Sequence, residues 1–431
     1  MQSVRSDASS LRQRRSRFWD VLPHLAVPIA AIVCAGGSAL AQPIITNMGV
    51  LQGGFYSIGH ATSANGLTVI GYSDAASGGR AFRWTIETGM VSLGTFPSGT
   101  FSYALDISTL GDFIAGTGDS TIGNRAFRWN AASGMQDLGV LPGGTQSFAQ
   151  ALSGDGTVVA GSGDSDLGTH AFRWSAQTGM VSVGGLPGGT FSQSYGMNTD
   201  GSTLVGTADS VGGLRAFRWT NASGSVNLGT LPGGSYSRGQ AVSADGQFVV
   251  GNADIATGSP HAFRWRSADS TMQNLGTLSG SPTGYSYGRA ISNDGWAVLG
   301  QSDSALGDCA FIWTPTLGMV DLNDYLAARG TNLAGWRITD CRGISADGTT
   351  LVGSGLFNGE QRAFVVQRLS PITATPACVA DFNHNGATTA DDIFAFLEAW
   401  FAGLPTADVN HSGAADVSDI FAFLALWFAG C

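Results

Sequence analysis

One tetrapeptide, Ala-Phe-Arg-Trp, occurs five times without change in this chain of 431 residues. Successive copies lie 45, 45, 45 and 46 residues apart, and they begin at Ala81, Ala126, Ala171, Ala216 and Ala262. Two diverged copies follow at 310–313 and 363–366. A fixed period of this length is typical of a repeat architecture, in which one structural unit has been copied.

Each repeat reads as four short apolar or alternating runs separated by Gly, Asp and Ser, as in residues 101–141. Such runs are typical of β-strands joined by tight turns. Pairs such as Asp155-Gly156 fit hairpin turns that need a positive φ. Four strands in about 45 residues is the period of a β-propeller blade. The sequence therefore predicts an all-β fold, with an open β-solenoid as the alternative.

Counting the strands predicts how the ring closes. Sets of three strands begin near residues 56, 101, 147, 191, 236, 285 and 336, and the last set ends at Arg368 without a fourth strand. Residues 45–54 copy the fourth strand and its turn at the other end of the chain. We predict a seven-bladed β-propeller over residues 42–369, closed 3+1 by the N-terminal strand, because closure leaves no open edge between first and last blades. Residues 323–330 break the pattern and predict one helical turn.

The repeat resembles the HAF family of extracellular repeats over roughly residues 44–367. The resemblance is carried by His170-Ala171-Phe172 and His261-Ala262-Phe263, by Leu-Gly-x-Leu-Pro-Gly-Gly, and by Ser-x-Asp-Gly-x-x-Val-x-Gly. Arg replaces the His of this motif in most copies. The resemblance implies bacterial export and a propeller-like fold, and it implies no agreed ligand or reaction.

The N-terminal residues have the order of a secretory signal. Several Arg residues precede an apolar run over 25–33, and Ala39-Leu40-Ala41 follows. We predict a signal peptide over 1–41, cleavage after Ala41, and an extracellular or cell-surface location. A membrane anchor is the alternative, but the run is shorter than the roughly 20 residues that a spanning helix needs. The export route, general or twin-arginine, stays open, and no membrane span is expected after cleavage.

Composition excludes several functions. All 21 basic residues are Arg, so Schiff-base and P-loop lysine chemistry is excluded. The net charge of −10 argues against a nucleic-acid partner, which needs clustered positive charge.

Four cysteines remain beyond the signal segment, and an even number in an exported chain indicates disulfides. Sequence order favours the pairs Cys309–Cys341 and Cys378–Cys431. The alternative is free, buried thiols.

The third strand of each repeat places Phe82 and Trp84 on one face and Arg83 on the other. We expect the aromatic residues to pack between blades, and each Arg to pair with an Asp in the loop before its strand. The alternative for these Asp residues is loop capping. Their loops should share one face of the propeller, which then offers a candidate site for a glycan or a cation. Its candidate residues are Asp74, Asp119, Asp164, Asp209, Asp254, Asp303, Phe55, Phe101, Phe191, Tyr236 and Tyr285.

After a linker at 370–377, residues 378–431 contain two 12-residue loops, 381–392 and 408–419, that begin 27 residues apart. Each carries oxygen side chains at positions 1, 3, 5 and 12 with Gly at position 6, and each runs into an apolar helix. Six to eight oxygen ligands around a sharply turned loop suit Ca²⁺. The alternative is two Asx-rich turns without metal.

These loops resemble those of dockerins, because position 12 is Asp, no helix precedes the loop, and the chain ends in Gly430-Cys431. The resemblance implies two Ca²⁺ sites and a cohesin-like partner. The implied ligands are Asp381, Asn383, Asn385, Ala387, Thr389 and Asp392 in the first loop, and Asp408, Asn410, Ser412, Ala414, Asp416 and Asp419 in the second. The implied partner contacts are Ala390, Asp391, Val417 and Ser418.

The two apolar helices repeat the same spacing of large side chains. Residues at i, i+3, i+4, i+7 and i+8 form one stripe on each helix, so the stripes are expected to pack together. Their members are Ile393, Phe396, Leu397, Trp400 and Phe401, and Ile420, Phe423, Leu424, Trp427 and Phe428. Phe394 and Phe421 lie off the stripe and are candidate partner contacts.

No catalytic residues are predicted. The sequence favours an exported, surface-tethered binding or scaffold protein rather than an enzyme. The alternative is a polysaccharide-acting hydrolase or lyase, because dockerins often deliver such enzymes.

Overall fold

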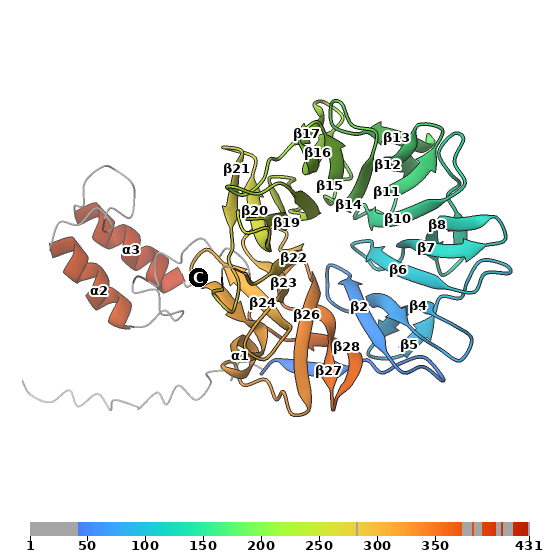
Figure 1. The fold of residues 1–431 in the computed structure, drawn as a ribbon. Helices are drawn as coiled ribbons and strands as arrows, with labels where there is room; N and C mark the ends of the chain where they lie inside the picture. Colours follow the sequence, from blue (N-terminus) through green and yellow to red (C-terminus); the bar gives the residue numbers. More distant parts are fainter. Residues whose placement is uncertain are drawn as a thin grey trace, which may run out of the picture. The chain divides into compact units, whose positions relative to one another are not determined.

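The computed structural model describes residues 42–281, 283–372, 382, 390–401, 407 and 417–429. Seven four-stranded antiparallel sheets surround a common axis, as Figure 1 shows. The first strand of each sheet contacts the first strands of both neighbouring sheets, so the seven first strands form the innermost ring. The predicted seven-bladed propeller is confirmed.

The strands follow the chain in order, four to a blade. Blade 1 contains β2 (Ser57–Thr62), β3 (Val69–Ser73), β4 (Arg80–Thr85) and β5 (Gly89–Ser92). Blade 2 contains β6 (Ser102–Ile107), β7 (Ile114–Ser120), β8 (Gly123–Asn130) and β9 (Gly134–Asp137). Blade 3 contains β10 (Ser147–Leu152), β11 (Val158–Ser165), β12 (Gly168–Ser175) and β13 (Gly179–Gly184). Blade 4 contains β14 (Ser192–Met197), β15 (Thr203–Ser210), β16 (Gly213–Thr220) and β17 (Gly224–Asn227).

Blade 5 contains β18 (Ser237–Val242), β19 (Phe248–Asp254), β20 (Pro260–Arg266) and β21 (Thr271–Asn274). Blade 6 contains β22 (Ser286–Ile291), β23 (Val298–Ser302), β24 (Cys309–Thr314) and β25 (Gly318–Asp321). Blade 7 contains β26 (Trp336–Ile344), β27 (Leu351–Phe357), β28 (Glu360–Gln367) and β1 (Ile44–Asn47).

The seventh blade is built from both ends of the repeat region. Its strand order is β1-β28-β27-β26, and Ile45 pairs with Val366 across the β1–β28 ladder. The predicted 3+1 closure is therefore confirmed. The open edge of β28 is covered by backbone hydrogen bonds from a strand more than 300 residues earlier in the chain.

The repeated aromatic residues fill the space between blades, as predicted. Phe82 is fully buried and Trp84 is 4% exposed, and both pack against Val352 and Val365 of blade 7. The second strand must carry Gly opposite this Phe. A Cβ on Gly71 would lie 2.9 Å from the Phe82 ring and 2.0 Å from the Ile58 carbonyl oxygen. The last Gly of the Ser-x-Asp-Gly-x-x-Val-x-Gly motif thus makes room for the aromatic residue of the next strand.

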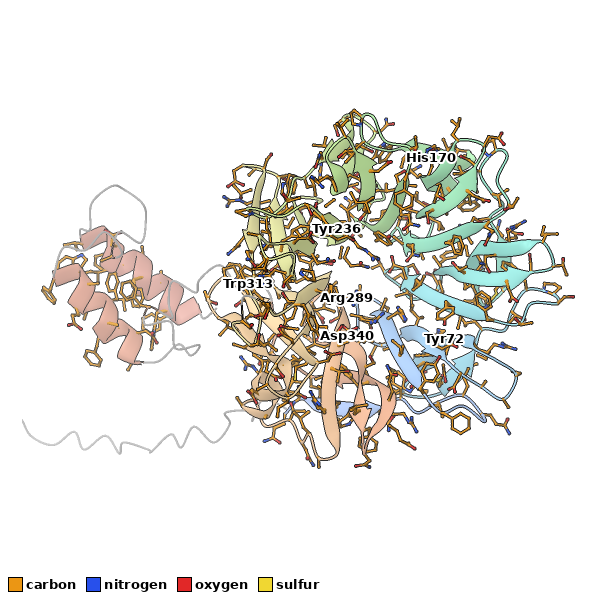
Figure 2. The ribbon with its side chains drawn as sticks, in the orientation of Figure 1. Tyr72, His170, Tyr236, Arg289, Trp313 and Asp340 are labelled. Carbon is orange, nitrogen blue, oxygen red and sulfur yellow. The ribbon has the colours of Figure 1, made fainter. Side chains whose placement is uncertain are left out.

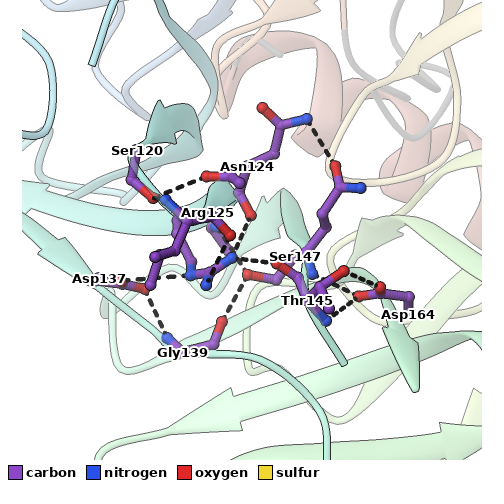
Figure 3. Close-up of polar contacts among 12 residues, drawn as sticks. Ser120, Asn124, Arg125, Asp137, Gly139, Thr145, Ser147 and Asp164 are labelled. Atoms are coloured by element: carbon purple, nitrogen blue, oxygen red, sulfur yellow. Dashed lines mark hydrogen bonds and ion pairs between the residues drawn. The ribbon is translucent and has the colours of Figure 1, made fainter. Parts of the chain in front are cut away.

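A buried serine joins each of six blades to the blade before it. Ser147 begins β10, its hydroxyl accepts a hydrogen bond from Ala126 N of blade 2 at 3.0 Å, and it donates to Gly139 O at 2.6 Å (Figure 3). We call this arrangement the serine clasp. Equivalent bonds are made by Ser57, Ser102, Ser192, Ser237 and Ser286.

The junction between blades 6 and 7 uses a helix in place of the serine. The predicted helical turn is present as α1 (Leu322–Ala327), with Asp321 as its N-cap. Asn323 Oδ1 accepts from Ile338 N at 2.8 Å, and Asn323 Nδ2 donates to Ile338 O at 3.1 Å. One side-chain amide therefore fastens the first strand of blade 7, where a serine clasp is absent from the described residues.

Two further helices follow the propeller in the chain, α2 (Ala390–Phe401) and α3 (Val417–Ala429). Their Phe396 and Phe423 rings stack with centroids 4.3 Å apart, and Phe382 meets both rings edge-on. The predicted packing of the two stripes is confirmed for most members. It is wrong for Phe401 and Phe428, which are each 78% exposed because they lie at the last turn of each helix, beyond the packed centre. No helix among the described residues is long and apolar enough to cross a membrane.

Removal of one serine clasp should destabilise the propeller. Ser147→Ala leaves the buried N–H of Ala126 and the carbonyl of Gly139 without their partner, so the free energy of unfolding should fall by about 1–3 kcal/mol. Chemical denaturation measures this change. Ser133→Ala is the control, because Ser133 is exposed and should change stability by less than about 0.5 kcal/mol. Equal effects of the two substitutions would contradict a structural role for the clasp.

Candidate functional site

Every innermost strand carries a β-bulge at the same position. In β2 the register shifts between Gly59 and Ala61, which leaves His60 as the extra residue. A bulge re-aims the extra side chain, and here it turns each one toward the propeller axis. Bulge residues from all seven blades line a cavity of about 220 Å³: His60, Leu105, Gln150, Tyr195, Gln240, Arg289 and Arg342. We call this space the axial cavity.

Opposite charges meet on one side of the axial cavity. Asp340 is 5% exposed, and its Oδ2 accepts from Arg342 Nε at 2.7 Å. Its Oδ1 lies 3.8 Å from Arg289 Nε, which is an ion pair but too long for a hydrogen bond. Figure 2 labels Arg289 and Asp340 near the centre of the ring. The wall from blades 6 and 7 therefore has two guanidinium groups and one carboxylate.

His60 faces this charged wall as a neutral imidazole. Burial lowers its pKa to about 3, and the charges of Arg342 and Arg289 contribute to the shift. Protonation would place a third positive charge in a space with little water. His60 therefore provides a hydrogen-bonding group that stays uncharged at neutral pH.

At the other end of the axis, main-chain hydrogen bonds link the first turns of neighbouring blades. Thr109 N donates to Gly154 O at 2.8 Å, and Gly154 N donates to Thr199 O at 2.7 Å. Similar bonds join Ala64 to Thr109, Ala244 to Asn293, and Ala346 to Ala64. These turns surround a second space of about 210 Å³.

Asp106 borders both spaces. Its Oδ2 accepts from Leu152 N of the next blade at 2.7 Å, and its Oδ1 accepts from Ile107 N at 2.8 Å. Desolvation outweighs these hydrogen bonds and raises the pKa of Asp106 to about 6. The carboxyl borders two narrow spaces, so its charge is solvated less well than that of an Asp on the open surface.

The aspartates of the predicted ligand face act as loop caps. Asp164 Oδ1 accepts from Thr145 N at 2.8 Å and from Gln146 N at 2.5 Å, and its Oδ2 accepts from the Thr145 hydroxyl (Figure 3). The other Asp residues of this face contact the loop that contains the aromatic residue named with them as a candidate. The residue pairs are Asp74 with Phe55, Asp119 with Phe101, Asp209 with Phe191, and Asp303 with Tyr285. The carboxylate of Asp254 instead accepts from the Ser235 hydroxyl at 3.2 Å, and Asp254 N donates to Tyr236 O at 3.0 Å.

The predicted Arg–Asp pairs are wrong. Arg83 stands opposite Ile70 in the ladder, whereas Asp74 lies four residues farther along, about 13 Å of strand away. The repeated Arg residues instead reach the first turn of the following blade: Arg128 donates to Gly156 O at 3.0 Å and Arg218 to Gly246 O at 3.0 Å. None of the ion pairs between described residues joins an Arg of the tetrapeptide to these aspartates.

A different arginine reaches the loops that the aspartates cap. Arg125 directly precedes the second tetrapeptide, donates to Thr145 O, and lies 3.7 Å from Asp137 (Figure 3). Arg80, Arg215 and Arg362 make equivalent bonds to the carbonyls of Thr100, Ser235 and Phe55. Sequence reasoning missed these residues, although an Arg stands one position before Ala in four of the seven copies.

The predicted Cys309–Cys341 disulfide is not formed, because the structure holds both cysteines as buried free thiols. They lie in different blades: Cys309 starts β24 beside the Ser304 hydroxyl at 3.3 Å, and Cys341 in β26 faces Val352 O at 3.5 Å. Burial raises the pKa of Cys341, which keeps its thiol protonated. The pair Cys378–Cys431 lies outside the described residues.

Most of the predicted Ca²⁺ ligands also lie outside the described residues. The two that are described, Asp392 and Asp419, are fully buried in the first turns of α2 and α3. Among the predicted partner contacts, Ala390, Val417, Phe394 and Phe421 are exposed, and the side chains of Asp391 and Ser418 are not described. Within the described ranges, no group of three or more His, Cys, Asp or Glu side chains could hold a metal.

The ring of blades, with its axial cavity, defines a seven-bladed β-propeller. No family model matches the sequence, and no curated protein matches it. Among solved structures, the chain is similar to an oligogalacturonate lyase in complex with manganese, with a TM-score of 0.50 and 12% identity over 75% of this chain and 92% of that one. An oligogalacturonate lyase from Vibrio parahaemolyticus gives 0.49 and 10% over 75% and 93%. TolB from Acinetobacter baumannii gives 0.42 and 12% over 60% and 63%. At this identity, the likeness to the manganese complex shows the fold alone.

Asp106 should make the free energy of unfolding change with pH in the opposite direction to the change caused by an Asp that caps a loop. Its folded-state pKa of about 6 exceeds its ordinary value of 3.8, so its contribution is present below about pH 4 and is lost as the pH rises through 6. The stability of the native protein relative to Asp106→Asn should therefore fall by about 1–2 kcal/mol between pH 4 and pH 7, as measured by unfolding at each pH.

Asp164→Asn is the matched control. Burial acts to raise the pKa of Asp164, but hydrogen bonds from Thr145 and Gln146 outweigh it and lower the pKa. The contribution of Asp164 is thus present above its ordinary pKa and is lost in acid. If the stability of the native protein relative to each variant changes with pH in the same direction, the raised pKa assigned to Asp106 is wrong.

Proposed function

We propose that this protein is an exported binding or scaffold protein, tethered by a Ca²⁺-dependent, dockerin-like module at its C-terminus to a cohesin-like receptor at the cell surface. The observation that carries the tether is the duplication seen in α2 and α3. Each helix buries an Asp in its first turn, Asp392 or Asp419, and each contributes one ring to the Phe396–Phe423 stack.

The donor chemistry at these two positions fits calcium. Asp392 and Asp419 occupy position 12 of the two loops. Ca²⁺ prefers oxygen ligands, and positions 1, 3, 5 and 9 of both loops are Asp, Asn, Ser or Thr. When bound, the ion would hold each loop against the start of its helix.

The outer surfaces of the same helices support a protein partner. Phe394 and Phe421 are 68% and 69% exposed, and they occupy equivalent positions 27 residues apart. Phe401 and Phe428 add a second equivalent pair. Aromatic side chains left in water on a small module are typical of interaction surfaces. Duplicated aromatic positions therefore favour docking to a receptor.

The propeller supports binding through its axial cavity. The loop aspartates are engaged in capping, and the polar groups of the cavity come from bulge positions that differ from blade to blade. Variation within a repeated frame favours recognition of a ligand.

The competing proposal is a hydrolase or lyase acting on polysaccharide. One observation favours it: Asp106, whose pKa is raised to about 6, borders the axial cavity and could accept or donate a proton there. Release of reducing ends from polysaccharides, abolished by Asp106→Asn, would establish the enzyme and overturn the binding proposal.

Calcium should stabilise the C-terminal module. Binding to the folded form alone raises the unfolding free energy by about 2.7 kcal/mol at a concentration 100-fold above Kd. Calorimetry of the purified protein should therefore show one transition that moves to higher temperature with Ca²⁺ and returns with EGTA. Asp392→Ala and Asp419→Ala should each reduce the shift.

Asp324→Ala in α1 is the matched control, because Asp324 is an exposed first-turn Asp of a helix in the propeller. Its calcium-dependent shift should equal that of the native protein. Identical melting curves in Ca²⁺ and EGTA would refute the metal sites. If the protein stays on the surface of the cells that produce it after EGTA treatment, the calcium-dependent tether is refuted.

A further inference from the structure

Three guanidinium groups from consecutive blades gather at one side of the axis. Arg238 lies in β18, Arg289 in β22 and Arg342 in β26. Burial lowers the pKa of Arg289, and the charges of Arg342 and Arg238 lower it further. The carboxylate of Asp340 opposes this effect. A protein with a net charge of −10 thus concentrates positive charge beside its axial cavity.

Two of these arginines keep unused hydrogen-bond donors. The Nε atoms of Arg238 and Arg289 are buried and have no hydrogen-bond partner among the described residues. Arg238 lies with its Cζ 3.7 Å above the centre of the Tyr195 ring, which occupies one face of the guanidinium, and it also interacts with the side chain of Tyr236. A buried donor without an acceptor is costly, which favours a small movement of either guanidinium group toward an acceptor, whether Asp340 Oδ1 beside Arg289 or an oxygen from outside the chain.

Arg289 connects the axial cavity to a second concavity. It also lines a groove of about 470 Å³ between blades 5 and 6, together with Arg238, Tyr236, Tyr287 and Asn252. Asp254 borders the same groove, and its Oδ2 lies 3.2 Å from the Ser235 hydroxyl in the loop. The groove therefore combines two arginines, two tyrosines, an amide and the carboxylate of Asp254, which lies toward the Ser235 loop, and Figure 2 labels Tyr236 and Arg289 on its two blades.

We propose that Arg238 and Arg289 bind the carboxylate of an acidic ligand in this groove, with Arg342 and Asp340 fixing the position of Arg289. The planar fork of a guanidinium matches the two oxygens of a carboxylate, and a partly buried site strengthens that pair. The tyrosines offer ring faces and hydroxyls to the rest of the ligand. The carboxylate belongs either to a uronic acid residue of an acidic polysaccharide or to a free organic acid.

This inference rests on the proposal that the propeller is a binding module. Its test is separate from the tether, because calcium-dependent melting and surface retention do not involve the groove. Loss of carboxylate binding would leave those measurements unchanged, and failure of the tether would leave carboxylate binding unchanged.

Isothermal titration of the purified protein tests the proposal with four probes: glucuronate, trigalacturonate, citrate and glucose. The acids should bind and glucose should not, because glucose lacks the carboxylate of glucuronate. Binding of the uronates alone assigns the site to acidic saccharides, and binding of citrate alone or with them assigns it to carboxylates more generally. Absence of binding by every acid at millimolar concentration, or equal binding of glucose and glucuronate, would overturn the proposal.

Substitution of the two arginines locates the site. Arg238→Gln and Arg289→Gln should each weaken binding by roughly tenfold to a hundredfold, as loss of a charge-assisted hydrogen bond does. Arg238→Lys should recover only part of this loss, because an ammonium cannot bind a carboxylate through a planar fork. Arg266→Gln is the matched control, because Arg266 is exposed and pairs with Asp269 outside both cavities.

Arg238→Gln decides the test if Arg289→Gln does not fold, because Arg289 has an ion pair with Asp340 and none of the ion pairs between described residues includes Arg238. A melting curve equal to that of the native protein confirms that the variant is folded. Carboxylate binding by a folded Arg238→Gln with unchanged affinity would refute the assignment.

Discussion

The propeller depends on how each blade is joined to the one before it. In the third strand of a blade, the N–H of the repeated Ala has no partner on the fourth strand, because the ladder between the two strands ends nearby. The hydroxyl of the serine that begins the next blade accepts a hydrogen bond from this N–H. The same hydroxyl donates to the carbonyl of a Gly at the end of the fourth strand. A buried N–H and a buried carbonyl are thus both satisfied by one small side chain. Because this bond spans two blades, it fixes their distance and leaves the Phe and Trp of the tetrapeptide just enough space to pack.

Because these contacts hold the blades together, one residue in each blade, the bulge residue of the first strand, can vary. The bulge residue of the first strand faces the axis, where neither the ladder nor the packing between blades specifies its side chain. The seven residues found there include an imidazole, two amides, a phenol, two guanidinium groups and Leu105. The residues on either side of the bulge are small in six of the seven blades, as in Gly59 and Ala61 or Gly288 and Ala290, because the neighbouring blade lies close. A Cβ on Gly288 would lie 3.0 Å from the carbonyl oxygen of Gly251. Residues that are similar in most blades and a residue that differs between blades therefore lie next to each other in the same strand.

The sequence predicted the parts of this structure that are encoded within single repeats. Seven blades and the closing strand followed from counting, because residues 45–51 copy a fourth strand that the last repeat lacks. Contacts between repeats were harder to predict. The Arg83–Asp74 pairing failed because both residues recur at constant spacing, yet the ladder places them at different ends of the blade. The Cys309–Cys341 pairing failed for a similar reason: β24 and β26 contact each other, but Cys309 lies beside Arg337, four residues before Cys341 on β26.

The axial cavity was missed although a signal for it was present. A pattern of a small residue, a variable residue and a second small residue stands in six of the seven first strands, as in Ala149-Gln150-Ala151 and Ser194-Tyr195-Gly196. If this pattern is interpreted as a regular alternating strand, its central residue is assigned to the packing between blades. Only the register shift shows that it is an extra residue turned to the axis. Two-residue periodicity cannot reveal a bulge, because the bulge is the place where that period breaks.

The departures from regular repetition coincide with the charged side of the propeller. The first four copies of the tetrapeptide are evenly spaced, and the spacing grows from the fifth onward. In the same part of the chain α1 replaces a serine clasp, and Arg238, Arg289, Arg342 and Asp340 appear in the first strands. Blades 1 to 4 contribute only His60, Leu105, Gln150 and Tyr195 at the bulge, none of which carries a charge at neutral pH. The evenly copied blades thus contribute one carboxyl, Asp106, to the lining of the axial cavity, and the blades that have diverged contribute its guanidinium groups. A ligand bound at this side would contact only a few of the seven blades, and its specificity could change without altering the junctions that hold the ring closed.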